Sequence, residues 1–421
     1  MEPTRRANNR KRQLDSTVPA LDAASLVAVP GSSPTAALQP GMAYAADRIC
    51  EQALGGEALL SHTLESEFGR LGIILIPVAD IDLFKDKQRT LAAVLKGVEL
   101  AAESGAKCVS FTGMIPAATD YAGDIAAAVR RHTGENPALD ALQLTSGHAS
   151  VVAAFAFNIE RLLNFAGRTY QDERVAFVGL GSIGEGIARL MAARPAPRQI
   201  YLIDVTAKKD LLERLKSDLT REYDLPATGI DVITVDAHQS LPTDLYPEIS
   251  LILSATSGPE VIDVDALVPG TLIVDDSFPL GYNARKAVER MKAAGDIMIT
   301  IAGAFQCPAR FTPNFPPVET EDAGLIELRR IISRMSNPWP DCLTGCIFSA
   351  YLTPQFGLPE TIGPVTAKDA LRFYDTLRRH DFTGTPPYFF TFGFERNDPI
   401  YSLGSPRPLQ APPLRGARAE P

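Results

Sequence analysis

The sequence predicts an α/β fold in which a doubly wound Rossmann domain follows a smaller N-terminal α/β domain and precedes a set of C-terminal helices. Three observations lead to this prediction. Six short segments rich in Val, Ile and Leu alternate with helical segments after residue 174, as in a parallel sheet covered on both faces. A glycine-rich turn follows the first of these segments, and an acidic residue ends the second. A length of 421 residues is sufficient for two domains with tails.

The Rossmann domain is assigned to residues 147–317. Its predicted strands lie at 174–179, 199–204, 230–235, 249–254, 270–275 and 296–301. Its clearest helices are predicted at 183–194, 208–221 and 282–293. A further helix over 146–165, with apolar residues along one face, leads into the domain.

The N-terminal α/β domain is assigned to residues 46–146, where short apolar runs alternate with helical stretches. Strands are predicted at 73–77 and 108–111, and helices at 86–104 and 122–132. Residues 318–400 carry helical stretches near 320–335, 341–353 and 366–379, which we expect to pack on the N-terminal domain or to form the surface of a homodimer. Composition predicts disordered tails at 1–45 and at the proline-rich 401–421.

Composition and charge narrow the class of protein. The formal net charge of −9 argues against a nucleic-acid partner. No apolar run reaches the roughly 18 residues that span a bilayer, so no membrane insertion is expected. The five cysteines are scattered and lack paired C-x-x-C spacing, so no metal site is predicted. Reduced thiols favour a location in the cytoplasm.

A dinucleotide-binding turn is predicted directly after the strand that begins at residue 174. The strand leads into Gly179-Leu180-Gly181-Ser182-Ile183-Gly184, and an amphipathic helix follows. Gly179 permits the tight turn, Gly181 lets the backbone approach the pyrophosphate, and Gly184 lets the helix pack close to the strand. The phosphates then meet N–H groups at the helix start, where Ser182 and Ile183 lie.

The cofactor is predicted to be NAD or NADP. Asp204 ends the second strand, where a carboxylate accepts both ribose hydroxyls and repels a 2′-phosphate, which favours NAD. Lys208 and Lys209 follow closely and are suited to a 2′-phosphate instead.

Two further loops are expected to line the nicotinamide end. Ala255, Thr256 and Ser257 follow the fourth strand and are expected beside the nicotinamide ribose. Asp275 and Asp276 follow the fifth strand, at the carboxyl edge where substrate meets cofactor. They either orient the substrate or cap the next turn.

Four runs stand in order along the chain: Ser110-Phe111-Thr112-Gly113, Leu144-Thr145-Ser146-Gly147-His148-Ala149, the glycine turn, and Ile273-Val274-Asp275-Asp276-Ser277-Phe278-Pro279. In order and spacing they resemble the long-chain acyl-carrier-protein reductases of cyanobacteria, over about residues 68–355. The resemblance implies reduction of an acyl thioester, on acyl carrier protein or CoA, to an aldehyde through an acyl-cysteine. It also favours NADPH, although the cyanobacterial enzymes carry a longer glycine turn.

The family's nucleophilic cysteine lies on a helix after the Rossmann domain, and the resemblance places it at Cys346 in Thr344-Gly345-Cys346-Ile347-Phe348-Ser349-Ala350. A thiolate there attacks the thioester, and hydride transfer to the bound acyl group gives a hemithioacetal that collapses to aldehyde. Thr145, Ser146 and His148 are the candidate donors to the oxyanion. His148 is also a candidate general acid, with a helix-capping role as the alternative.

The residues themselves favour a rival nucleophile, Cys342. The run Asn337-Pro338-Trp339-Pro340-Asp341 is typical of a helix start. Cys342 would then lie nearer the helix N-terminus than Cys346, which would lower its pKa, and the two would share a helix face. Cys307 is a third candidate. For each of the three, packing as a small buried hydrophobe is the alternative.

Other polar residues receive simpler interpretations. Asp120 and Tyr121, in the loop after Gly113, line the substrate channel or belong to an ordinary polar loop. The remaining histidines are expected at the surface: His62, His132, His238 and His380.

Two other functions stay open at this point. One is a two-domain dehydrogenase of the amino-acid or shikimate type, which requires a catalytic Lys–Asp pair in the first domain. Lys85, Lys87 and Lys96 are available there, but none lies in a typical active-site loop. The other is a protein that binds NAD(H) without turnover and contacts a partner through its basic N-terminal arm.

Overall fold

The computed structural model describes residues 20–30, 49–131, 137–237, 239–315 and 341–387. The chain forms two compact units. Unit 1 combines Met1–Ala153 with Phe305–Phe382, and unit 2 combines Ala154–Ala304 with Thr383–Pro421. The segment after the Rossmann domain therefore belongs largely to the N-terminal unit, and most of the second unit is inserted into the chain of the first.

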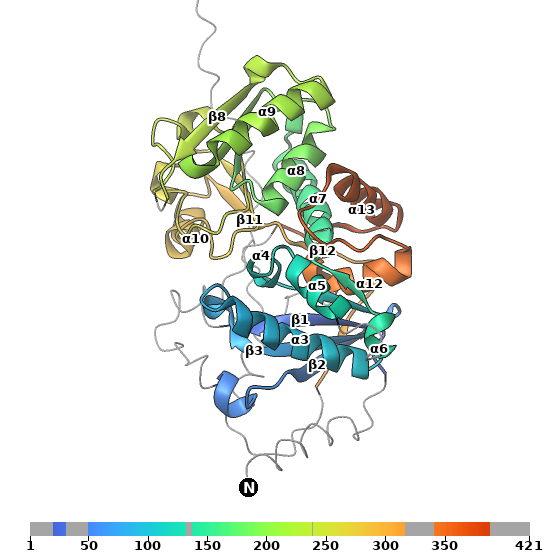
Figure 1. The fold of residues 1–421 in the computed structure, drawn as a ribbon. Coiled ribbons are helices and arrows are strands. Elements are labelled where there is room, and N and C mark those ends of the chain that lie inside the picture. The colour runs from blue at the N-terminus through green and yellow to red at the C-terminus, as the bar shows by residue number, and fades with distance from the viewer. Residues whose placement is uncertain (1–19, 31–48, 132–136, 238, 316–340, 388–421) are drawn as a thin grey trace, which may run out of the picture. The chain divides into compact units, whose positions relative to one another are not determined.

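Unit 1 is built on a six-stranded sheet in the order β13-β2-β3-β1-β4-β5. In that order the strands are Thr312–Asn314, Leu59–Ser66, Gly69–Ala79, Ala23–Val29, Cys108–Phe111 and Gln143–Thr145. The neighbouring strands β2, β3 and β1 are labelled in Figure 1. Strands β3, β1, β4 and β5 run parallel, and β2 and β13 add an antiparallel edge. The described helices of the unit include α3 (Lys87–Glu103), α4 (Ile115–Ala118), α5 (Gly123–Arg131), α6 (Pro137–Asp140), α12 (Gly345–Phe356) and α13 (Ala367–Arg379).

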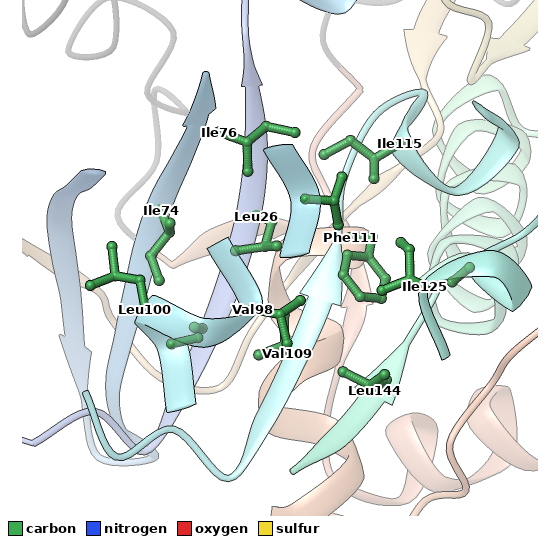
Figure 2. Packing of buried hydrophobic residues seen from close by; sticks show 14 of the residues in the cluster. Leu26, Ile74, Ile76, Val98, Leu100, Val109, Phe111, Ile115, Ile125 and Leu144 are labelled. Atoms are coloured by element: carbon green, nitrogen blue, oxygen red, sulfur yellow. The ribbon is translucent and has the colours of Figure 1, made fainter. Parts of the chain in front are cut away.

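Helix α3 packs against one face of this sheet and forms an apolar core with it (Figure 2). Asp86 caps its N-terminus by accepting a hydrogen bond from the N–H of Arg89 at 3.0 Å. Gly97 faces the sheet so closely that a Cβ there would lie 3.0 Å from side-chain atoms of Ile76 and Leu26. Each aliphatic side chain fully buried in such a core stabilises the fold by about 1.5–3 kcal/mol.

The opposite face of the same sheet carries small hydroxyl residues rather than large apolar ones. Ser110 on β4 donates to Ser25 on β1 at 3.1 Å and lies 3.3 Å from the carbonyl of Ile347 on α12. Because side chains alternate along a strand, Leu26 and Phe111 point into the core on the α3 side. Helix α12 therefore packs closely against this polar face of the sheet.

Strand β1 corrects the prediction of a disordered tail over 1–45. Ala23–Val29 is a buried strand between β3 and β4, with Ala23, Ala24 and Leu26 at 0% exposure. Its alanine-rich composition is weak in β-propensity. It is a strand because parallel neighbours on both sides pair with it. The ends of the chain predicted as tails, apart from 20–30, lie outside the described residues, as does the helix predicted at 320–335.

Unit 2 has a six-stranded parallel sheet in the order β11-β10-β9-β6-β7-β8. In chain order the strands are Arg174–Val178, Gln199–Val205, Ile230–Val235, Leu251–Ser254, Leu272–Asp275 and Met298–Ile301. Its helices include α8 (Ser182–Ala192), α9 (Lys209–Tyr223) and α10 (Ala284–Ala293). This is the doubly wound Rossmann order, so the predicted fold class is confirmed.

Helix α7 (His148–Ala166) begins in unit 1 and continues into unit 2. It is the one described helix long and apolar enough to cross a membrane, and 72% of its apolar window is buried within the protein. Such burial is usual for a core helix. Asn158 on α7 is 1% exposed; its amide donates to the carbonyls of Ala302 and Ala304, and its oxygen accepts from the N–H of Thr385 at 3.0 Å. Thr385 follows the short strand β15 (Thr383–Gly384).

The segment before α12 corrects the helix predicted over 341–353. Cys342–Thr344 forms the short strand β14 beside β12 (Ala304–Gln306), and α12 begins only at Gly345. The N–H of Cys307 donates to the carbonyl of Asp341 at 2.7 Å, which holds this stretch extended. The helix predicted over 366–379 agrees with α13, whose first turn is capped by the hydroxyl of Thr366.

Candidate functional site

The glycine turn of unit 2 has little space on one side and an open approach on the other. Gly179 adopts φ +83°, and a Cβ there would lie 2.7 Å from the carbonyl oxygen of Ala255. A Cβ on Gly184 would lie 1.9 Å from the carbonyl oxygen of Gly179. A Cβ on Gly181, by contrast, would meet no heavy atom within 4 Å. The first and third glycines are therefore required by packing, and the second leaves the space through which a phosphate approaches.

Helix α8 starts from this open side. Its N-cap is Gly181, which has no side chain to cap the helix, and Ser182 and Ile183 lie in the first turn. The first turn of a helix presents backbone N–H groups and the positive end of the helix dipole, a combination that binds phosphate. These residues fit the pyrophosphate of a dinucleotide.

Asp204 lies at the end of β7 with its carboxylate held at the turn. One carboxylate oxygen accepts from the N–H of Leu180 at 2.7 Å and from Nζ of Lys208 at 2.8 Å. The other accepts from the N–H of Val205 at 2.8 Å. Asp204, which is suited to ribose hydroxyls, and Lys208, which is suited to a 2′-phosphate, therefore lie in contact. The geometry is compatible with either NAD or NADP.

The predicted nicotinamide loop does meet the glycine turn. The N–H of Ala255 donates to the carbonyl of Val178 at 2.8 Å, which places the loop beside Gly179. The N–H of Thr256 donates to the hydroxyl of Ser277 at 3.0 Å, and that hydroxyl lies 2.8 Å from the hydroxyl of Ser254. The ends of β9 and β10 thus form one hydrogen-bonded edge, with Ser257 in the same loop.

Asp275 and Asp276 lie at this edge in a poorly hydrated environment. Asp275 is 2% exposed, and one of its oxygens accepts from the N–H of Ser277 at 3.3 Å. Its other oxygen has no hydrogen-bond partner among the described residues. Burial raises the pKa of Asp275 to about 6, and burial together with the Asp275 charge raises the pKa of Asp276 to about 8. The pair therefore retains a proton near neutral pH.

Cys346 lies in the first turn of α12 in unit 1. It is the only one of the five cysteines that is not buried, and its Sγ lies 3.7 Å from the hydroxyl oxygen of Thr344. The positive end of a helix dipole stabilises an anion in this position. Accessibility and position together are those that a nucleophilic thiol requires.

The N-terminus of α7 meets the N-terminus of α12 at this cysteine. Gly147 adopts φ +77°, and a Cβ there would lie 2.9 Å from Cα of Cys346. A Cβ on Gly345 would in turn lie 3.0 Å from the backbone of Ser150. Two glycines thus allow the first turns of both helices to touch. An anion at Cys346 lies at the positive ends of two helices.

The two rival cysteines lie in less favourable places. Cys342 is on β14 and 3% exposed, so the predicted shared helix face with Cys346 is wrong. Burial and the neighbouring Asp341 carboxylate raise the pKa of Cys342 to about 12. Burial also raises the pKa of Cys307 well above its usual value. Both stay thiols at neutral pH, whereas the thiolate is the nucleophile.

The three predicted oxyanion donors flank Gly147, which meets Cys346, but their surroundings differ from those expected. The Thr145 hydroxyl, wholly buried, lies 2.8 Å from the Thr361 hydroxyl and 3.3 Å from that of Ser349. The side chain of Ser146 is also wholly buried. Burial lowers the pKa of His148 to about 4, so its imidazole is neutral at pH 7. The N–H of Gly147 donates to the Thr145 hydroxyl at 3.3 Å and the N–H of His148 donates to the Ser146 hydroxyl at 3.4 Å. The backbone candidates to receive an oxyanion are therefore the next N–H groups of the first turn of α7, those of Ala149 and Ser150.

The loop of Asp120 and Tyr121 has an unusual backbone. Asp120, Tyr121 and Ala122 adopt φ values of 51°, 52° and 70°, three consecutive left-handed residues without a glycine. The turn brings the ring of Tyr121 to 5.8 Å from the ring of His148, edge to face. The N–H of Gly363 donates to the Tyr121 carbonyl at 2.9 Å. Such strain concentrates near functional sites, and no pattern in the sequence signals it.

The surface interpretation of His62 is wrong. His62 is 7% exposed, its ring stacks on Phe315 with centroids 4.8 Å apart, and its Nδ1 lies 3.1 Å from the Ser61 hydroxyl. The edge strand β13 covers β2 at this point, which the polar local sequence conceals. His380 is exposed, as predicted. His132 and His238 lie outside the described side chains and segments. Within the described residues no group of three or more His, Cys, Asp or Glu side chains is arranged to hold a metal.

Comparison with known proteins gives distant similarities. No protein-family profile matches the chain. The chain is 26% identical over 229 residues to the aminotransferase PigE of Serratia sp. strain ATCC 39006, which covers 54% of this chain and 24% of that protein. The chain thus spans about a quarter of the length of this curated relative.

Three of the solved structures that are similar to this chain have low TM-scores. L-tryptophan dehydrogenase from Nostoc punctiforme has a TM-score of 0.31 and 13% identity, covering 86% of this chain and 89% of that one. D-mandelate dehydrogenase from Rhodotorula graminis has a TM-score of 0.29 and 15% identity, covering 48% and 61%. Salmonella D-lactate dehydrogenase has a TM-score of 0.26 and 13% identity, covering 84% and 95%.

The sheet order and the glycine turn define the class of the protein: it is a Rossmann-type α/β protein. The turn, the start of α8 and Asp204 form an arrangement that fits the pyrophosphate and adenosine ribose of NAD or NADP.

Proposed function

We propose that the protein is an NAD(P)H-dependent oxidoreductase that reduces an acyl thioester, carried by acyl carrier protein or CoA, to an aldehyde through an acyl group on Cys346. One observation carries the proposal: the only unburied cysteine lies where the N-termini of α7 and α12 meet. This cysteine belongs to a chain whose other unit has a dinucleotide turn. Unit 1 supplies the group that holds the substrate, and unit 2 supplies the cofactor site.

The first half of the reaction is acyl transfer and needs no cofactor. The Cys346 thiolate attacks the carbonyl carbon of the thioester, and the electron pair of the C=O bond moves onto oxygen. As the tetrahedral species collapses, the bond to the carrier sulfur breaks and the carrier thiolate takes a proton from solvent. The N–H groups of the first turn of α7 stabilise the transient oxyanion. No atom is oxidised or reduced in this half.

The second half reduces the acyl group. NADH or NADPH, when bound, supplies a hydride to the carbonyl carbon of the acyl-cysteine. The resulting hemithioacetal of Cys346 releases the aldehyde as its C–S bond breaks, and the cysteine leaves as the thiolate that began the cycle. Burial keeps His148 neutral at pH 7, so its part is to donate or accept a hydrogen bond rather than to deliver a proton as imidazolium.

Residues of unit 2 would hold the cofactor. Ser182 and Ile183 at the start of α8 would bind the pyrophosphate, and Asp204 with Lys208 would contact the adenosine ribose. The loop of Ala255, Thr256 and Ser257 would border the nicotinamide ribose.

An amino-acid or shikimate dehydrogenase would require a Lys–Asp pair in unit 1, and the Lys–Asp pairs found there, Lys85 with Asp82 and Lys87 with Asp124, have exposed lysines. The three lysines considered for that reaction form ion pairs with carboxylates near the surface: Lys85 with Asp82 at 2.6 Å, Lys87 with Asp124 at 2.8 Å and Lys96 with Glu57 at 3.1 Å. Such pairs are ordinary surface features.

Intact-protein mass spectrometry tests the proposal. The full chain is mixed with a series of acyl-CoAs, and with acyl groups on a carrier protein, in the absence of cofactor. We expect a mass gain of one acyl group in the wild type and in Cys342→Ala, and none in Cys346→Ala. Acylation that persists in Cys346→Ala would reject Cys346 as nucleophile. A wild type that is never acylated, yet binds NAD(P)H, would reject the thioester reaction in favour of another dehydrogenase or a binding protein.

A further inference from the structure

We infer that Ser150 is a positioning residue, whose hydroxyl holds the start of α12, and with it Cys346, against the first turn of α7. The inference rests on the proposed function in one respect, namely that Cys346 is the group that reacts. It assigns the control of that group to a side chain that never touches the substrate.

The Ser150 hydroxyl contacts both partners of the helix contact. It lies 2.8 Å from the carbonyl oxygen of Gly147 and 2.9 Å from that of Gly345, and Ser150 is wholly buried. A Cβ on Gly147 would lie 2.9 Å from Cα of Cys346, and Gly345 directly precedes Cys346. The Ser150 hydroxyl thus connects Gly147, just before α7, with Gly345, at the start of α12.

The hydroxyl has one proton, which it shares between the two carbonyl oxygens, and only one of these two contacts is explained by the helix itself. A serine in the first turn commonly bonds a carbonyl three residues before it, as Ser150 does with Gly147. The carbonyl of Gly345, by contrast, is 195 residues away in the chain and belongs to another helix. This second bond has no local role, and its effect is to fix the distance between the two helix ends.

That distance matters because the interaction of an anion with a helix dipole falls off within one turn. The two glycines leave no spare room in the contact: an added Cβ on either would come to 3.0 Å or less from backbone atoms opposite. A small outward movement of Gly345 therefore removes Cys346 from the N–H groups of α7.

The remainder of α12 is held independently of Ser150. Ser110 lies 3.3 Å from the carbonyl of Ile347, and Ser349 lies 3.3 Å from the hydroxyl of Thr145. Removal of the Ser150 hydroxyl is therefore expected to release the first turn of α12 and to leave the helix docked on the sheet.

The test measures alkylation of Cys346 by iodoacetamide in the full chain, by mass spectrometry, across the pH range around the ordinary thiol pKa of about 8.5. Ser150→Ala is expected to slow alkylation at neutral pH about tenfold and to move the midpoint of its pH profile upward, because the thiolate loses one helix dipole. Gly345→Ala, which pushes on the Ser150 backbone from the other side, is expected to do the same and serves if Ser150→Ala does not fold.

Thr90→Val is the matched control. Thr90 is 1% exposed and its hydroxyl donates to the carbonyl of Leu83 at 2.9 Å, so the variant also loses one buried hydroxyl–carbonyl bond in unit 1. It is expected to lower the melting temperature and to leave the alkylation profile unchanged.

A wild-type alkylation profile in Ser150→Ala, or an equal change in Thr90→Val, overturns the inference. Failure of the proposed function has a different result: the wild type gains no acyl group from any thioester, while its alkylation still depends on Ser150. Acylation of the wild type and of Ser150→Ala at the same rate rejects the positioning role alone.

Discussion

Gly147 and Cys346 approach so closely that a methyl group on Gly147 would lie 2.9 Å from the Cα atom of Cys346. The contact joins the beginning of α7 to the beginning of α12, and it depends on a residue without a side chain in a left-handed conformation.

Gly147→Ala is expected to abolish acylation of Cys346, because the added methyl group separates the two helix ends. It should also destabilise the protein by about 1–3 kcal/mol through backbone strain. Gly56→Ala is the control: Gly56 has φ +76°, but a Cβ there meets no heavy atom within 4 Å. Mass spectrometry and thermal unfolding of both variants separate strain from contact. Equal acylation in the two would contradict the role of the contact.

Gly181 and Gly184 are expected to respond differently to alanine. Gly181→Ala adds a methyl group in open space, so the fold should persist while NAD(P)H affinity falls about tenfold or more through contact with the phosphates. Gly184→Ala places the methyl group 1.9 Å from the carbonyl oxygen of Gly179 and should destabilise unit 2 itself. Fluorescence titration with NADH and NADPH, together with melting curves, distinguishes the two effects. Full cofactor affinity in Gly181→Ala would place the phosphates elsewhere.

Lys208 is expected to set the tolerance for NADPH. Lys208→Ala removes the ammonium that lies 2.8 Å from Asp204 and leaves a carboxylate without its cation, which repels a 2′-phosphate. NADPH affinity should fall about tenfold relative to NADH, since charge-assisted hydrogen bonds contribute about 1.5–3 kcal/mol. Lys209→Ala, the same loss of charge one residue on, should change the ratio little. An unchanged NADPH to NADH ratio in Lys208→Ala would be evidence against this role.

His148 is expected to lower the free energy of unfolding of the protein in acid. Its folded-state pKa of about 4 lies below the ordinary value of 6.5, so its contribution is complete above pH 6.5 and is lost as the pH falls toward 4. The loss amounts to about 3 kcal/mol. His148→Gln should flatten the dependence of the melting temperature on pH over this range, and the exposed His380→Gln should not. A slope that survives in His148→Gln would show that another group titrates.

Asn158 is expected to contribute more to the stability of unit 2 than one ordinary buried side chain. Asn158→Leu leaves the carbonyls of Ala302 and Ala304 and the N–H of Thr385 without this partner in a buried place. A loss of about 3 kcal/mol follows from two or three unsatisfied groups. Asn158→Asp, which directs an oxygen at the two carbonyls, should be at least as damaging. Urea unfolding measures both, and an Asp variant as stable as the wild type would contradict these bonds.

Much of unit 2 is predictable because its signals are local. Buried parallel strands are continuous apolar runs, and the turn is recognised by the spacing of Gly179, Gly181 and Gly184. Strand β1 is not predictable in this way, because alanine-rich Ala23–Val29 becomes a strand only through its neighbours. Helix α12 begins later than predicted for a similar reason: Cys342–Thr344 pairs beside β12, and this pairing overrides the local helix signal.

The candidate site is predictable only in part. Cys346 and His148 are named by a resemblance of sequence, but their states depend on burial and on partners far along the chain. The left-handed Gly147, directly before a helix, is the one local signal that could have indicated a close approach.

The bond between Ser150 and Gly345 also has a consequence for synthesis of the protein. It closes a loop of 195 residues that contains most of unit 2, and closing a long flexible loop costs entropy that a folded insert has already lost. During synthesis this bond can therefore form only after residue 345 has been added to the chain, and earlier folding of the inserted residues lowers the entropy cost of closing the loop.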